Sequence, residues 1–362
     1  MDKRLLIYLL LFLAHLLNAQ EKKGDFSVED AGTSSVDTIQ KKPEEDFYKA
    51  AIKLQDSAKW KESMIPLKKA LKINPEYLNA SNKMGFAKYN LEDLMGAEFD
   101  YLWSLKIEPN NFEALKYLGI IYFKNKRYND AKMYMDSAGN QRVDDPEFFY
   151  YRAKLMFTGK EYKKALSLAD YATEENKKYT EAYLLKAEIR LAMKDYNYAL
   201  KELNDAEKTI PADKPDYNLY KTRAKTKFEL RDYKGAVTDW NVYIDANPNQ
   251  EEALISRAAA KINSNEFSSA IVDLDDAAKL NPKNPVIYNY RGVAKGENKQ
   301  IVEGLKDLDY AIKLKFNYPA AYVNRAALKF ASKDKRGACQ DLEKADALGD
   351  QMAYKLIEQY CK

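Results

Sequence analysis

The chain of 362 residues repeats its sequence pattern with a 34-residue period, which restricts it to folds built from stacked equivalent units. Glycine or alanine stands at one position of nine consecutive units, and a second small residue follows twelve positions later in each. Small side chains let two helix axes approach to about 8–10 Å. A single helical pair cannot bury its apolar face alone, so the units must stack. The two sets are Ala51, Gly85, Gly119, Ala153, Ala187, Ala224, Ala258, Gly292 and Ala326, and Ser63, Ala97, Ala131, Ala165, Ala199, Ala236, Ala270, Gly304 and Ala338.

The pattern as a whole resembles the tetratricopeptide repeat (TPR) family. The segment ALKYLGIIYFKNKRYNDAKMYMDSA (114–138) is close to the family pattern of leucine, glycine, tyrosine, alanine and aromatic positions. A closing proline recurs on one register in INPEY (73–77), IEPNN (107–111), ANPNQ (246–250) and LNPKN (280–284). The resemblance covers about 310 residues and implies an all-α solenoid, a superhelical stack of about nine TPR hairpins followed by a capping helix. It is specific for the fold and says little about function.

This register predicts the organisation of the chain. The expected parts are a signal peptide at 1–19, a flexible linker at 20–43, repeats one to five at 44–213, repeats six to nine at 217–352 and a capping helix at 353–362. The cap is needed because the apolar face of a terminal unit would otherwise meet water. Lys214, Pro215 and Asp216 form an insertion between units five and six. It predicts either a change of stacking angle that divides the array into two blocks or a longer turn without a bend.

The segment 1–19 has the composition of an export signal. Lys3 and Arg4 give a basic start, a largely apolar stretch of thirteen residues follows at 5–17, and Ala19 ends a small-residue cleavage site. Thirteen residues span about 20 Å as a helix, less than the roughly 30 Å hydrocarbon core of a bilayer. We therefore expect cleavage rather than a membrane anchor, and no transmembrane span afterwards.

Composition excludes several classes of function. Cleavage after Ala19 would leave 57 of the 59 basic and 54 of the 55 acidic residues, and it would remove the only histidine, His15. Such a balanced charge gives no electrostatic reason to expect nucleic acid or an anionic membrane as a partner. The sequence lacks a CxxC pair, zinc-ligand spacing, a phosphate-binding GxxxxGK and a GxSxG. Its acids are dispersed over repeat positions, unlike the paired carboxylates of a glycosidase. We expect no enzyme, no metal and no cofactor.

An arginine and an aspartate sixteen residues apart recur in four consecutive units, as Arg223 with Asp239, Arg257 with Asp273, Arg291 with Asp307, and Arg325 with Asp341. A catalytic pair occurs once, whereas a pair that recurs once per unit predicts a structural ion pair between the two helices of a unit. Lys186 and Glu202 are a weaker version of this pair. Arg152 meets Leu168 at the matching position, so we expect it to be freer than the others; the alternative is an exposed arginine whose stem only covers packed side chains.

The resemblance also implies a concave groove lined by the first helices of the units. Transferring the groove positions to units two to four gives Asn82, Phe86, Tyr89, Asn90, Lys116, Phe123, Lys124, Tyr150, Lys154 and Phe157. Aromatic rings among amides and ammonium groups suit an extended peptide, because the rings bury side chains while the polar groups bind backbone or carboxylates. The alternative is that the rings only fill space between units. Ile52 and Lys83 replace two asparagines of the carboxylate clamp of chaperone-binding members, so we do not expect that activity.

Two cysteines, Cys339 and Cys361, stand in the last hairpin and at the end of the chain. In an oxidising compartment they could join the cap to the array, and two free thiols are the alternative. Gly304 occupies a position where seven of nine units have alanine, and Gly292 and Gly296 lie in the same unit. Because glycine weakens helices, we expect unit eight to be the softest layer.

The ending RGACQDLEKADALGD (336–350) and the alanine–glutamine boundary at 19–20 are similar to exported TPR proteins of Bacteroidetes-type bacteria. That resemblance implies a periplasmic or outer-membrane-associated location. The expected function is a non-enzymatic scaffold or adaptor of the cell envelope that binds a protein or peptide partner in its groove, within an assembly or secretion complex. The alternative is an accessory protein that binds glycan or another ligand along the same groove.

Overall fold

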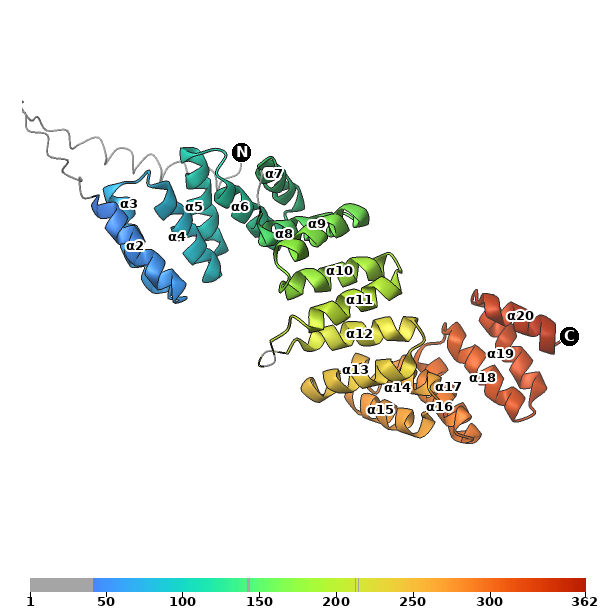
Figure 1. The fold of residues 1–362 in the computed structure, drawn as a ribbon. Coiled ribbons are helices and arrows are strands. Elements are labelled where there is room, and N and C mark those ends of the chain that lie inside the picture. Colours follow the sequence, from blue (N-terminus) through green and yellow to red (C-terminus); the bar gives the residue numbers. More distant parts are fainter. Residues whose placement is uncertain (1–41, 142–143, 212, 214) are drawn as a thin grey trace, which may run out of the picture.

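The computed structural model describes residues 42–141, 144–211, 213 and 215–362. The predicted signal peptide and nearly all of the predicted linker lie outside these residues, as does Lys214. The described part contains nineteen α-helices and no strand. Figure 1 shows them following one another along a curved, elongated path from α2 to α20. The all-α solenoid expected from the sequence is therefore confirmed.

The helices pair in sequence order into nine hairpins with one helix left over. The first helices of the hairpins are α2 (Pro43–Asp56), α4 (Leu78–Asn90), α6 (Phe112–Lys124), α8 (Pro146–Thr158), α10 (Thr180–Ala192), α12 (Tyr217–Glu229), α14 (Glu251–Asn263), α16 (Pro285–Glu297) and α18 (Pro319–Ala331). The second helices are α3 (Trp60–Ile73), α5 (Leu94–Ile107), α7 (Tyr128–Gly139), α9 (Tyr162–Glu175), α11 (Tyr196–Glu207), α13 (Tyr233–Ala246), α15 (Phe267–Leu280), α17 (Ile301–Leu314) and α19 (Lys335–Ala347). The last helix is α20 (Gln351–Tyr360).

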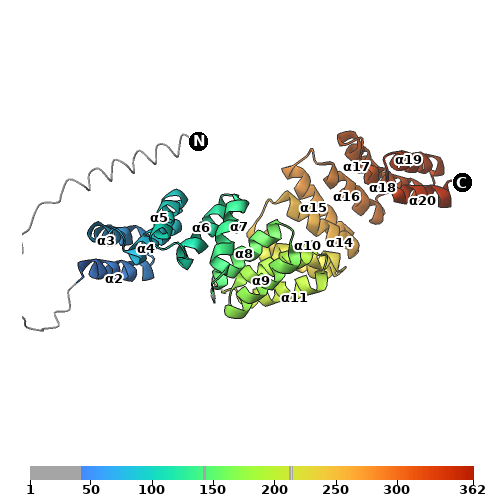
Figure 2. The same cartoon turned by 90° about the horizontal axis from the view of Figure 1, so that it is seen from above.

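Each second helix packs on the first helix of its own hairpin and on the first helix of the next one. First helices of successive units also contact one another, as in α6 with α8 and α16 with α18. Among the described helices, second helices of successive units do not approach one another to the same degree. The first helices therefore lie on the inner side of the stack and the second helices on its outer side. Figure 2 shows the same succession of helices from α2 to α20 in a second view.

The apolar core is divided into two large clusters with smaller ones between them. One large cluster runs through units two to five and includes Tyr101 and Phe148, and the other runs from Leu254 to the cap. Small clusters around Leu219 and Trp240 occupy the region between them. The insertion between units five and six lies in this region, and α11 still packs on α12 there. Whether the array bends at the insertion stays a prediction.

The glycines of unit eight lie where two helices touch backbone to backbone. A Cβ atom added to Gly304 would lie 2.7 Å from the carbonyl oxygen of Gly292, and one added to Gly292 would lie 2.9 Å from that of Gly304. Gly296 faces the side chain of Leu328 in the next unit. These contacts give the glycines a packing role, since no larger residue fits between α16 and α17. They argue against the expectation of a soft layer.

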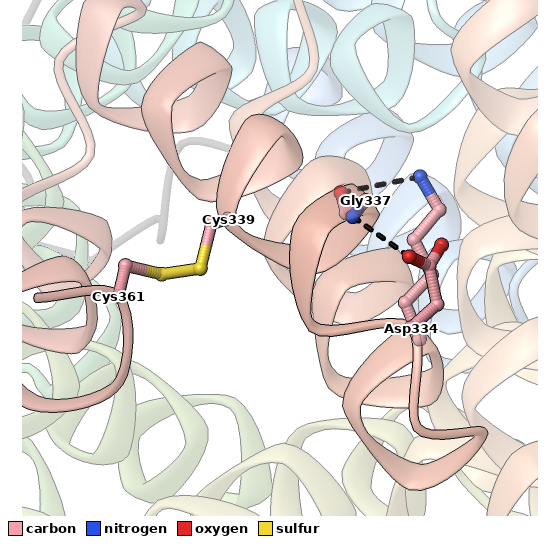
Figure 3. The surroundings of a disulfide bond; sticks show 5 residues. Asp334, Gly337, Cys339 and Cys361 are labelled. Atoms are coloured by element: carbon pink, nitrogen blue, oxygen red, sulfur yellow. Dashed lines mark hydrogen bonds between the residues drawn. A yellow bond between two sulfur atoms is a disulfide. The ribbon is translucent and has the colours of Figure 1, made fainter.

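Helix α20 caps the array and is covalently attached to it. Ala353 is fully buried, and Leu356 and Ile357 pack against the last apolar cluster. Asp350 begins the helix by accepting hydrogen bonds from the backbone amides of Met352 and Ala353. Figure 3 shows the disulfide that joins Cys339 of α19 to Cys361 at the end of α20. Of the two alternatives left open by the sequence, the structure contains the disulfide.

We predict that Gly304→Ala destabilises the protein, although alanine is the better helix former by about 1 kcal/mol. The added methyl group would clash with Gly292 and Leu328, and such overpacking costs about 1–3 kcal/mol. The measurement is the urea midpoint of unfolding. Gly159→Ala is the control, because a Cβ there would lie 3.5 Å from its nearest neighbour. An unchanged or higher midpoint for Gly304→Ala would contradict the packing role.

We predict that Cys339→Ser/Cys361→Ser weakens the attachment of the cap. The disulfide closes a loop with a sequence separation of 22 residues, for which the loss of the cross-link costs about 3 kcal/mol. Faster hydrogen exchange in α20 and α19, with unchanged exchange in α4 to α8, is the expected result. Exchange in α20 that matches the wild type would show that its apolar contacts alone hold the cap.

Candidate functional site

All four predicted pairs of arginine and aspartate form in the structure. In each pair, Nη2 and Nε of the arginine donate to the two carboxylate oxygens of the aspartate, the two-point geometry that makes such pairs strong. The Nη2 to oxygen distances are 2.9 Å for Arg223 and Asp239, 2.7 Å for Arg257 and Asp273, 2.7 Å for Arg291 and Asp307, and 2.5 Å for Arg325 and Asp341. All four aspartates are buried.

The same bases also reach back to the second helix of the preceding unit, which we did not predict. In Arg291, Nη1 lies 2.7 Å from an Asp275 oxygen. Equivalent contacts join Arg152 to Asp136 (3.3 Å), Lys186 to Asp170 (2.9 Å), Arg223 to Asn204 (3.2 Å), Arg257 to Asn241 (2.9 Å) and Arg325 to Asp309 (2.7 Å). The pairs therefore connect successive units as well as the two helices of one unit. Arg152 has the contact with the preceding unit, but with Leu168 at the acid position it has no acid within its own unit, so it makes fewer ion pairs than Arg291 or Arg325.

A lysine one helical turn after each arginine shares the buried aspartate. The distances are 2.7 Å for Lys227 and Asp239, 2.8 Å for Lys261 and Asp273, 2.7 Å for Lys295 and Asp307, and 2.8 Å for Lys329 and Asp341. These lysines recur with the same 34-residue period, so the sequence pattern contained the evidence for this second cation. Each carboxylate in units six to nine is thus neutralised by two cations, which offsets the cost of burying it.

Unit two shows what happens when one of the two cations is missing. Met84 stands at the arginine position, and the buried Asp100 keeps only Lys88, whose Nζ lies 2.7 Å from its Oδ2. Burial raises the pKa of Asp100 to about 6, and the interaction with Lys88 offsets only part of that rise. The N-terminal units therefore depend less on charge pairs and more on ring packing.

The predicted groove residues fall on the inner side of the curve, on α4, α6 and α8, but they do not behave alike. Asn82 and Lys116 are buried. The Asn82 amide nitrogen donates to Asn111 (3.0 Å), although its Oδ1 has no described hydrogen-bond partner, and Lys116 lies between Asp145 (2.9 Å) and Glu147 (3.1 Å). Asn90 is exposed and donates to the carbonyl of its own helix at Phe86 (2.8 Å). Of the predicted amide and ammonium groups, Lys124 and Lys154 therefore stay available to a partner.

The predicted aromatic side chains of α4, α6 and α8 take part in three separate sets of ring contacts. Phe86 and Tyr89 both contact Tyr117 of the next unit, with ring centroids 5.5 Å and 5.2 Å away. Phe123 contacts Tyr151 at 6.1 Å, and Tyr151 contacts Tyr150 at 5.1 Å. Phe157 lies at the end of α8 beside Tyr162, at 5.9 Å. The predicted rings are half-buried, so they fill space between units and still present an edge to solvent.

Two lysines lie over these rings without an ion pair to any described residue. The Nζ atom of Lys124 lies 4.2 Å from the ring centre of Tyr89, and that of Lys154 lies 5.3–5.7 Å from those of Tyr150, Phe123 and Tyr151. Desolvation by burial lowers the pKa of Lys124, although Glu147 and Glu92 act in the opposite direction. Both ammonium groups are held by ring faces, and their remaining hydrogen-bond donors point to solvent or to a ligand.

Glu188 of α10 extends this surface into unit five. Its side chain is exposed, yet neighbouring protein atoms desolvate the carboxylate and raise its pKa, while Lys154 has the opposite effect. An exposed group that is nevertheless desolvated lies in a concave surface. Sequence reasoning missed Tyr117, Tyr151 and Glu188. Which side chains of neighbouring units meet, and how deep the groove between them is, depends on the stacking angle between hairpins, and the sequence pattern does not give that angle.

The described residues offer little support for other kinds of site. No group of three or more histidine, cysteine, aspartate or glutamate side chains in them could hold a metal ion. Among the described helices, none has both the length and the apolar character needed to cross a bilayer. The surface over α4, α6, α8 and α10 is therefore the candidate site, and we call it the aromatic groove.

We predict that Asp100 makes the protein less stable as the pH rises. Its pKa of about 6 in the folded state lies above the ordinary value near 4, so the folded state binds the proton more tightly than the unfolded state. Between about pH 4 and pH 6 the free energy of unfolding should fall by about 3 kcal/mol from this group alone. Asp100→Asn should remove that part of the slope in urea unfolding.

A matched control is Asp307→Asn in unit eight. It leaves Arg291 and Lys295 without the negative charge and one of the two acceptor oxygens that they share, so it should lower the urea midpoint already at neutral pH. Parallel pH profiles for Asp100→Asn and the wild type would contradict the prediction.

No protein-family model matches the chain, and no curated protein sequence matches it. Solved structures do match. PilF of Pseudomonas aeruginosa is 15% identical with a TM-score of 0.52, over 58% of this chain and 95% of that chain. YrrB, described as a TPR protein with an unusual peptide-binding site, is 18% identical with a TM-score of 0.48, over 52% of this chain and 95% of that chain. A TPR protein from Parabacteroides merdae is 17% identical with a TM-score of 0.36, over 79% of this chain and 99% of that chain.

At this level of identity the likeness extends to the fold alone. The repeated hairpins, the buried small residues at the 34-residue period and the likeness to PilF agree on that fold. The chain has the fold of an all-α solenoid built from stacked helical hairpins, as in PilF.

Proposed function

We propose that the protein is a non-enzymatic scaffold that binds an extended segment of another protein along the aromatic groove. The observation that carries this proposal is the pair Lys124 and Lys154, which lie over aromatic rings and form no ion pair with a described residue. Elsewhere in the array, buried or half-buried basic groups such as Arg291 and Lys295 are paired with acids. Unpaired cations on an inner, half-apolar surface are typical of a binding site.

The chemistry of the groove favours a peptide over the alternative of a glycan. Sugars stack on open faces of aromatic rings, but here the ring faces of Tyr89 and Phe123 are covered by lysine ammonium groups or contacted by other rings. The ring edges remain, and they suit apolar side chains of a peptide. The ammonium groups suit its carbonyl oxygens or carboxylates.

We place this scaffold outside the cytoplasm, in the periplasm or at the outer membrane, as part of an envelope assembly or secretion complex. The export signal expected at 1–19 supports this location. The disulfide between Cys339 and Cys361 also supports it, because structural disulfides persist in oxidising compartments.

We predict that Lys124→Glu/Lys154→Glu abolishes capture of the partner while the array stays folded. Charge reversal at both positions would place carboxylates where the partner's acceptors bind, so affinity should fall by about tenfold or more. The measurement is chemical crosslinking in cells of the native host, followed by mass spectrometry of the proteins recovered with each variant. Circular dichroism reports helicity.

The matched control is Lys126→Glu/Lys160→Glu, which has the same change of charge on two exposed hairpin turns of the same units. If the groove variant and this control recover the same proteins, the proposal is wrong. Loss of a protein from the groove variant only would identify the partner.

A further inference from the structure

The outer side of unit two exposes an apolar row that the groove does not explain. Met95, Phe99 and Leu102 of α5 are 78%, 60% and 41% exposed. Their spacing of four and three residues places them on one face of the helix, pointing away from the hairpin. Large apolar side chains in such a row mark an interaction surface more often than single exposed ones do.

The row belongs to the first three units and is absent from the others. At the position of Phe99, unit one has Ile65 and unit three has Met133, which are 61% and 54% exposed. The next three units have Ser167, Lys201 and Thr238 there. In units seven and eight, Val272 and Val302 are exposed, but each stands alone among polar residues on its helix face. We call Ile65, Met95, Phe99, Leu102 and Met133 the outer apolar row.

Unpaired lysines border this row on α3. Lys61, Lys68 and Lys72 occupy the positions equivalent to Met95, Leu102 and Lys106, so they share one helix face with Ile65. All three are exposed and form no ion pair with a described residue, while Glu62 is the exposed acid of this helix. Some exposed lysines of other second helices are paired locally, as in Lys132 with Asp136 on α7 and Lys279 with Asp276 on α15. The outer side of units one and two is therefore both apolar and basic.

The positive charge of these lysines distinguishes between the possible partners of this surface: a second copy of the chain, an acidic helix and a bilayer. A second copy of the chain would bring two rows of lysines face to face, which like-charge repulsion opposes. An acidic helix would need a groove with apolar walls, but second helices of successive units diverge on the outer side, so the row lies on separate ridges. A broad anionic surface can contact several ridges at once. Trp103 lies beside Phe99 and Leu102, half-buried, and tryptophan is enriched at membrane interfaces.

We propose that the outer side of units one and two is a peripheral docking surface for an anionic lipid bilayer. The tips of Met95, Phe99 and Ile65 enter the headgroup region, and Lys61, Lys68 and Lys72 contact lipid phosphates. The surface lies opposite the aromatic groove, which stays open to its partner. This inference goes beyond the scaffold function and does not depend on it.

The test measures vesicle binding by flotation, with vesicles of phosphatidylcholine alone and of equal parts phosphatidylcholine and phosphatidylglycerol. The full chain and the chain beginning at Gln20 are both used, because the apolar residues 5–17 would bind vesicles by themselves. The expected result for the chain beginning at Gln20 is binding to the anionic vesicles, at least about tenfold weaker binding to the neutral ones, and loss of binding near 0.5 M salt, where surface charges are strongly screened. A shift in tryptophan fluorescence that Trp103→Phe removes should accompany binding, because Trp103 is half-buried beside the row; Trp60 is also half-buried and packs on Phe86, and Trp240 is buried in the core.

Met95→Glu/Phe99→Glu and Lys61→Glu/Lys68→Glu/Lys72→Glu should each reduce binding by about tenfold or more. The matched control is Val272→Glu/Val302→Glu, which places two glutamates at equivalent outer positions of units seven and eight and should leave binding unchanged. All these positions are exposed, so circular dichroism should show a folded array for each variant. Two outcomes overturn the proposal. One is no binding of the chain beginning at Gln20 to anionic vesicles, which would leave an acidic protein as the occupant. The other is equal binding of the row variants and the control.

Discussion

The contact on which the structure depends is the approach of two helices at a small residue, which recurs once in every unit. Ala51 and its eight equivalents are buried, and in unit eight Gly292 and Gly304 bring two backbones into contact. Because this approach recurs at one position, every hairpin has a similar shape and presents similar faces to its neighbours. The array can then change its surface from unit to unit without changing its fold.

The two ends of the array use this freedom differently. In units six to nine, each arginine joins the second helices of two successive units, and a lysine completes the neutralisation of its aspartate. Units one to three have Ala50, Met84 and Leu118 at the arginine position, and rings such as Tyr101 and Tyr117 stack between units instead. Packed rings leave apolar edges exposed at the surface, whereas the charges of an ion pair neutralise each other and leave little for a partner to bind. Both candidate binding surfaces accordingly lie in the N-terminal half.

The fold and the spacing of the structural ion pairs could be predicted because they depend on the period alone. Asp275, the partner of Arg291 in the preceding unit, recurs with the same period. It lies sixteen positions before Arg291, and the sequence alone does not show that the two residues meet until the stacking of the hairpins is known. The burial of Lys116 between two carboxylates has the same origin. The contact of Arg152 with Asp136 of the preceding unit also depends on this stacking. Positions within one hairpin follow from the sequence, and contacts between hairpins follow from the stacking angle.

A solenoid with different surfaces on its two sides can hold two partners without direct competition. The aromatic groove lies on the inner side, where first helices converge, and the outer apolar row lies on the opposite side, where second helices diverge. Unit two contributes to both, through Phe86 and Tyr89 of α4 and through Met95 and Phe99 of α5. The buried Asp100, with one cation where later units have two, lies between these two surfaces in the same hairpin. Because burial raises the pKa of Asp100 to about 6, unit two is where a change of pH near that value alters a charge that lies between both surfaces.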